Sequence, residues 1–236
     1  MTSRRYLPAI FLLFVGSGCA ALIYEIVWFQ LLQMVIGSSA ISLGILLGTF
    51  MGGMCVGSLL LPRLVSARQH PMRVYAYLEL GIGALGILIL LLMPLVGSVY
   101  MKWAGTGTPG IVLRAIAAAI CLLPPTMLMG ATLPAISRWV KATPEGISWL
   151  GFFYGGNIGG GVIGSLTAGF YLLRVHDVVF ATAAAGALNI LVAAIAILLA
   201  ARTIYVPDES APAAFPTVGW SIARSPSPEC PRWPRR

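Results

Sequence analysis

Residues 178–201 read VVFATAAAGALNILVAAIAILLAA and contain no charged side chain. A helix needs about 20 apolar residues to cross a hydrocarbon core of roughly 30 Å, and this run is long enough. Across the chain 58% of the residues are hydrophobic and 9% are charged, whereas an ordinary soluble domain has about 25% charged residues. The composition therefore excludes a soluble globular protein and predicts an all-α membrane protein.

Five further apolar runs of spanning length precede this one. They cover residues 7–35, 38–61, 74–97, 111–134 and 149–173. We therefore predict a polytopic bundle of about six transmembrane helices over residues 1–206, embedded in a lipid bilayer. The run from Leu7 is interpreted as an uncleaved first helix rather than a signal peptide, because it continues well past Cys19.

Basic residues are distributed unevenly between the two sets of loops, and this bias predicts the orientation. One side carries Arg4, Arg5, Arg63, Arg68, Arg73, Arg138, Lys141 and Arg202; the other carries Lys102, Arg114 and Arg174. Because positive residues stay on the inner side, both termini are predicted to be cytoplasmic. The basic residues fall singly in short gaps rather than in a patch, so we expect no nucleic-acid partner.

From Pro207 onward the composition changes. Residues 207–236 are rich in proline and arginine and have too few apolar residues to form a core. We predict a disordered cytoplasmic tail over 207–236, although a truncated or frame-shifted end would have the same character.

Glycines spaced four residues apart are the most frequent pattern in the apolar runs. The pairs are Gly48 with Gly52, Gly53 with Gly57, Gly155 with Gly159, Gly156 with Gly160, and Gly160 with Gly164. Such spacing lets helix backbones approach closely in lipid, so the second and fifth helices are predicted to be central and tightly packed. Residues 52–59 and 160–166 also resemble each other, which fits either an inverted repeat or shared packing chemistry.

We single out three polar residues within the apolar runs, because an ionisable group there costs about 2.5–3.5 kcal/mol on insertion scales. They are Glu25, Glu79 and Asn157, each on a face of small residues that should turn into the bundle. Their depths predict that Glu79 and Asn157 share a site near the cytoplasmic face, with Glu25 apart from them. The alternative is structural: a satisfied hydrogen bond, or a buried ion pair such as Glu79 with Arg138.

Two other patterns are weaker. Residues 81–86 match the dinucleotide-binding glycine motif but follow no strand, and the four cysteines have no metal-ligand or disulfide spacing, so we expect neither a cofactor nor a metal. Pro124, Pro125 and Pro134 should break or kink the fourth helix, because proline removes backbone hydrogen bonds.

Three stretches together resemble a known family. They are residues 17–32, with Tyr24-Glu25-x-x-Trp28 at their centre, 125–139 and 154–166. They are similar to the membrane domain of bacterial fused proteins, in which a major-facilitator-like region is joined to a spermidine-synthase-like domain. The resemblance covers roughly residues 10–202. It implies a multi-pass protein of the bacterial inner membrane without the aminopropyltransferase domain, so we do not expect an enzyme.

Two functions follow from this resemblance and the polar residues. The first is a carrier or binding module for a polyamine-like cation, with Glu79, Asn157, Tyr154, Glu25 and Tyr24 as candidate binding residues. Six helices equal half a major-facilitator protein, so a carrier would need a homodimer or a second polypeptide. The second function is a structural membrane anchor that recruits a soluble synthase domain.

Overall fold

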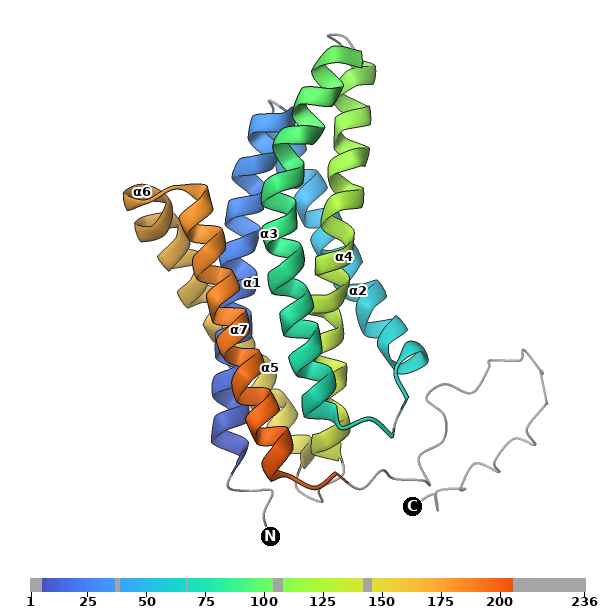
Figure 1. The fold of residues 1–236 in the computed structure, drawn as a ribbon, viewed down its shortest axis with the longest axis vertical. Coiled ribbons are helices and arrows are strands. Elements are labelled where there is room, and N and C mark those ends of the chain that lie inside the picture. Colours follow the sequence, from blue (N-terminus) through green and yellow to red (C-terminus); the bar gives the residue numbers. More distant parts are fainter. Residues whose placement is uncertain (1–5, 37–38, 67, 104–107, 142–145, 206–236) are drawn as a thin grey trace, which may run out of the picture.

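The computed structural model describes residues 6–36, 39–66, 68–103, 108–141 and 146–205. Within these ranges it contains no strand and six segments long and apolar enough to cross a membrane (Figure 1). The helices are α1 (Leu7–Ile36), α2 (Ser39–Leu64), α3 (Pro71–Trp103), α4 (Thr108–Lys141), α5 (Gly146–Thr167), the π-helical turn η2 (Ala168–Leu172), α6 (Leu173–Val175) and α7 (Val178–Arg202). The fifth span combines α5, η2 and α6. The predicted all-α membrane bundle is confirmed, and the tail over 207–236 lies outside the described residues.

Local sequence explains where several helices begin. Pro71 opens α3, a position at which its missing N–H leaves no helical hydrogen bond unmade. Asp177 caps α7, because its carboxylate accepts a hydrogen bond of 2.8 Å from the backbone N–H of Phe180. Helices α3 and α4 both extend beyond their apolar runs, since helical hydrogen bonding continues into the polar flanks.

The three prolines of α4 do not break it, contrary to one form of the prediction. Pro124, Pro125 and Pro134 all lie inside one continuous helix. Next to the first two, the Thr126 hydroxyl lies 3.0 Å from the Leu122 carbonyl oxygen and 3.3 Å from that of Thr49 in α2. A neighbouring hydroxyl of this kind helps a proline-containing helix to stay intact within a membrane.

Helix α1 is the centre of the bundle. In its most apolar window 50% of the residues are buried, against 22% in α2 and 28% in the fifth span. The prediction that the second and fifth helices are central is therefore wrong. Closely spaced glycines report a close approach to one neighbour, not the number of neighbours.

That close approach is made by one glycine row in each of the two helices. A side chain at Gly160 of α5 would collide with the carbonyl of Val15 in α1, and one at Gly57 of α2 would collide with the carbonyl of Met127 in α4. The most extensive pairings are accordingly α1 with α5 and α2 with α4. If spans 1, 2 and 3 are exchanged with spans 4, 5 and 6, the pairing of span 1 with span 5 becomes the pairing of span 4 with span 2. This symmetry supports the inverted-repeat interpretation.

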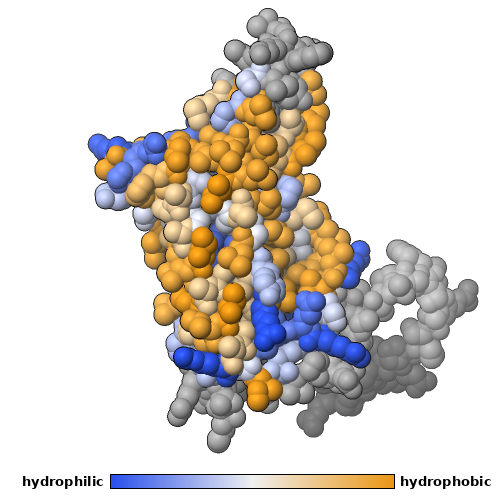
Figure 2. Space-filling view, viewed as in Figure 1, coloured by the Kyte–Doolittle hydropathy of each residue, from blue (hydrophilic) through white to orange (hydrophobic). Residues whose placement is uncertain are grey.

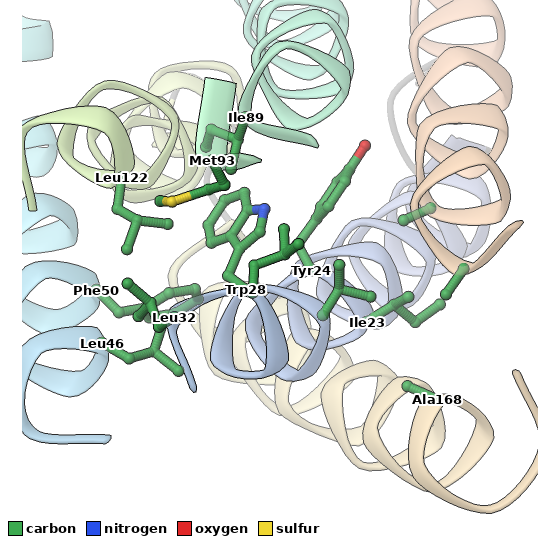
Figure 3. Packing of buried hydrophobic residues seen from close by; sticks show 14 of the residues in the cluster. Ile23, Tyr24, Trp28, Leu32, Leu46, Phe50, Ile89, Met93, Leu122 and Ala168 are labelled. Atoms are coloured by element: carbon green, nitrogen blue, oxygen red, sulfur yellow. The ribbon is translucent and has the colours of Figure 1, made fainter. Parts of the chain in front are cut away.

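Two clusters of buried apolar residues fill the bundle, one toward each end. In the first, Trp28 of α1 points toward Ile89 and Met93 of α3 (Figure 3). Leu90 of α3 is half-buried and packs against this cluster. Leu91 is the exposed neighbour, with 67% of its surface accessible.

The surface separates by polarity. Hydrophobic residues cover the middle of the face shown in Figure 2, and hydrophilic residues gather at its lower end and beside α6. The beginning of α1 and the end of α7 lie at the same end of the bundle (Figure 1). This arrangement is that of a six-span protein with a hydrocarbon-facing belt.

Candidate functional site

A cavity of about 410 Å³ lies beside α1 and is lined by residues of six spans. Its polar lining residues are Ser17, Glu25, Glu79, Thr132, Tyr154, Asn157, Ser165 and Asn189. Apolar residues such as Leu22, Met54 and Ile82 form the remaining wall. Ligand sites in proteins commonly combine a mostly apolar wall of this kind with a few converging polar groups.

Glu79 of α3 is the most unusual residue of the cavity. Its side chain is 0% exposed, and neither carboxyl oxygen has a hydrogen-bond partner of good geometry among the described residues. Ser17 of α1 and Tyr75 of α3 approach the carboxyl group, but the Tyr75 hydroxyl donates to the Leu13 carbonyl at 3.3 Å. A buried polar group without partners is rare in native proteins and suggests a site that is completed by a ligand.

Asn157 and Tyr154 of α5 line the same cavity as Glu79. The Asn157 side chain donates a hydrogen bond of 3.3 Å to the backbone carbonyl of Phe14, which fixes the amide against α1. Tyr154 is 57% exposed. The structure therefore brings Glu79, Asn157 and Tyr154 together around one space.

Glu25 also lines this cavity, contrary to the expectation that it stands apart. Ser17, Ala21, Leu22 and Glu25 of α1 all face the cavity. They span about 12 Å along the helix axis. Because the cavity extends along α1, a difference in depth does not separate the two carboxylates.

Arg138 does not form the ion pair that we considered for Glu79. Its guanidinium donates to the carbonyl of Val65 at 3.1 Å and reaches that of Ser66 at 3.5 Å. Arg138 lies near the C-terminal end of α4, where these carbonyls after α2 are within its reach. Its contacts therefore hold the residues after α2, and among the described residues Arg138 does not supply a cation to Glu79.

Tyr24 is not among the residues that line the cavity. It is 0% exposed and stacks on Trp28 with ring centroids 5.4 Å apart (Figure 3). Its hydroxyl faces Gly86 of α3 and Gly186 of α7, both too small to obstruct it. Tyr24 therefore contributes to packing on the α3 and α7 side of α1.

Ser17, Thr132 and Asn189 are site residues that the sequence analysis did not single out. Asn189 of α7 is 1% exposed, and its side-chain nitrogen has no hydrogen-bond partner within the described ranges. It lies against Gly83, one turn beyond Glu79. The signal was present, because Asn189 is the one amide in the apolar run over 178–201.

The charges around the cavity have one sign. Two carboxyl groups line it, whereas its described lining includes no lysine, arginine or histidine. No group of three metal-binding side chains occurs within the described part of the chain. The arrangement suits a ligand that brings positive charge and hydrogen-bond donors.

A larger groove of about 630 Å³ lies between α1 and α5, lined by residues such as Phe11, Val15, Phe152 and Ile163. Among its lining residues only Ser148 has a polar side chain. A groove of this composition on a membrane bundle is suited to lipid chains. We therefore assign the candidate site to the smaller, polar cavity.

No protein-family model, curated protein sequence or solved structure matches this chain. The resemblance to the membrane domain of fused spermidine-synthase-like proteins therefore stays a prediction.

Proposed function

We propose that this chain is a membrane module that binds or carries a small organic cation of the polyamine type. The observation that supports it most is the fully buried Glu79 carboxyl group, unpartnered among the described residues, on a cavity that also contains Glu25. An ammonium group has three hydrogen-bond donors and no acceptor, and an ionised carboxylate is an acceptor only. The two are chemically complementary.

The rest of the cavity favours the same class of ligand. Tyr154 supplies an aromatic ring and a hydroxyl, and Leu22, Met54 and Ile82 supply apolar wall for a methylene chain. A volume of about 410 Å³ falls within the roughly 300–1,000 Å³ range of small-molecule sites. The polyamine class of the ligand and the bacterial inner membrane are inferred from the family resemblance. The carboxyl groups of the cavity independently favour a positively charged ligand.

A membrane anchor, the second function expected from the sequence, has no need of this cavity. Anchoring requires only apolar helices and a docking surface, so selection for it would favour filling a void and removing an unpartnered carboxyl. The two functions therefore make opposite predictions for ligand binding.

Thermal unfolding of the purified full-length protein in detergent tests the proposal. 1,4-Diaminobutane and spermidine should raise the apparent Tm, whereas uncharged 1,4-butanediol should not. A ligand at 100 times its Kd stabilises a protein by about 2.7 kcal/mol. The Glu79→Gln variant should remain folded and lose this response, because an amide cannot supply the negative charge.

Asp177→Asn is the matched control. It removes the same charge at a residue that is not among those lining the cavity, and asparagine still caps a helix. It should keep the full response to the diamine. Equal responses of wild type and Glu79→Gln, or no response of the wild type to either amine, would contradict the proposal.

A further inference from the structure

The surroundings of Glu79 determine whether its carboxyl group is protonated or ionised when no ligand is bound. Tyr75 on the same helix and Ser17 of α1 approach its carboxyl group, and Tyr24 lies near it on the α3 and α7 side of α1. Glu25 of α1, Thr132 of α4, Tyr154 and Asn157 of α5 and Asn189 of α7 line the same cavity as Glu79. Within the described part of the chain, none of these neighbours is a cation. Glu25, the only other charged group among them, adds a second negative charge when ionised.

An ionised carboxylate in this position is costly. Removing it from water carries a large free-energy penalty, which is recovered only with a nearby opposite charge or several donated hydrogen bonds. The Ser17 and Tyr75 hydroxyl groups approach Glu79, but neither carboxyl oxygen has a hydrogen bond of good geometry among the described residues. The one cation considered for it, Arg138, binds the carbonyls of Val65 and Ser66 instead. The empty site therefore favours the neutral acid.

An ammonium ion reverses this preference. It brings the charge and the donors that the ionised form lacks, so a carboxylate with a bound cation is again electrically neutral. A protonated carboxyl group, by contrast, offers the ammonium ion no compensating charge. The proton and the organic cation therefore compete for the same two oxygens.

We propose that Glu79 is a proton-exchange site, which is protonated in the empty cavity and releases its proton when an organic cation binds. The inference rests on the proposed function and adds the proton as a second ligand of the same site. The exchange is balanced: the Glu79 O–H bond breaks, the proton passes to bulk water, and an ion pair between the carboxylate and the ammonium group replaces it. A carrier with such a site would move the two cations in opposite directions.

Proton release is measured by titrating the full chain with 1,4-diaminobutane at pH 7, in two buffers with different ionisation enthalpies. The diamine keeps both of its protons at this pH, because alkyl amines titrate near 10.4. The difference in binding heat should correspond to about one proton released per diamine bound. Binding with no proton release overturns the exchange and leaves the cation site standing, whereas the absence of any binding overturns both.

Infrared spectroscopy tests the empty state separately. The difference spectrum of wild type minus Glu79→Gln should show the C=O band of a protonated carboxylic acid at pH 7, and diamine should remove it. The difference spectrum of wild type minus Glu25→Gln should lack the C=O band of a fully buried carboxylic acid, because Glu25 is only partly buried. No acid band in the wild-type minus Glu79→Gln spectrum of the ligand-free protein would overturn the proposal, whatever the titration shows.

Discussion

Helix α5 has two faces that differ in how completely they are packed. On one face, Gly160 and Gly164 bring the backbone against the carbonyls of Val15 and Cys19 in α1, with no room for even a methyl group. On the next face, Tyr154 and Asn157 border a cavity that contains an unpartnered carboxyl group. The bundle can pack backbone against backbone and yet leaves this space unfilled. Such a local departure from good packing is typical of a functional site.

The largest expected effect breaks the packed face. Gly160→Leu should abolish most of the folded protein in detergent, because its side chain would occupy the position of the Val15 carbonyl. The cost should be about 3 kcal/mol or more, at the upper end for overpacking. Gly155→Leu is the matched control, since nothing lies within 4 Å of a Cβ atom at that position. Equal yields by size-exclusion chromatography would show that the α1 and α5 contact is not needed for folding.

The second prediction concerns the cavity face. Glu79→Leu should raise the Tm of the ligand-free protein, because it removes a buried carboxyl group that no described residue satisfies. A buried unsatisfied polar group costs about 1–3 kcal/mol, and the gain should lie within that range. The same variant should lose all stabilisation by diamine. A lower Tm without ligand would instead indicate that Glu79 has a structural partner.

Some of the residues around the cavity were predictable from the sequence and others were not. The cost of polar groups in a membrane was enough to single out Glu79 and Asn157, which line one cavity. It did not place Tyr24 correctly, because consecutive residues point about 100° apart on a helix, so Tyr24 and Glu25 face different neighbours. Direction around the helix requires the packing partners to be known.

Two further differences have equally local causes. Arg138 has a long, flexible side chain, so its position in the sequence does not show which acceptor it will reach. In the structure its guanidinium binds carbonyls after α2 and not Glu79. Asn189 is a single amide in a long apolar run, which we interpreted only as a spanning helix. Its role depends on α7 lying beside Gly83 of α3, which only the folded structure provides.

The smallest expected effect lies away from both faces of α5, where His70 connects two helix ends. Its Nε2 lies 3.2 Å from the carbonyl oxygen of Thr203, and its Nδ1 accepts a hydrogen bond of 3.3 Å from the N–H of Met72. Burial lowers the pKa of His70 below 6.5; the Thr203 hydrogen bond raises it and Arg73 lowers it further. A proton on Nδ1 would oppose the Met72 N–H, so folding favours the neutral ring.

Because the folded state has the lower pKa, the stability from His70 is complete above pH 6.5 and is lost as the pH falls through the folded pKa. We therefore expect the Tm to decrease between pH 7 and pH 5, and His70→Gln to reduce this decrease. The His70 contribution should be within about 0.5 kcal/mol, as for other changes near the surface. Identical pH profiles of the Tm for the two proteins would show that His70 does not contribute to the pH dependence of stability.

A high-resolution structure of the full chain with saturating 1,4-diaminobutane would show directly whether an organic cation binds beside Glu79. We expect density in the cavity beside α1, with one ammonium nitrogen about 2.8 Å from a carboxyl oxygen of Glu79. The same density should be absent from the Glu79→Gln protein under identical conditions. An empty cavity in the wild type, or diamine bound only in the groove near Phe11 and Phe152, would contradict the assignment of this cavity as a cation site.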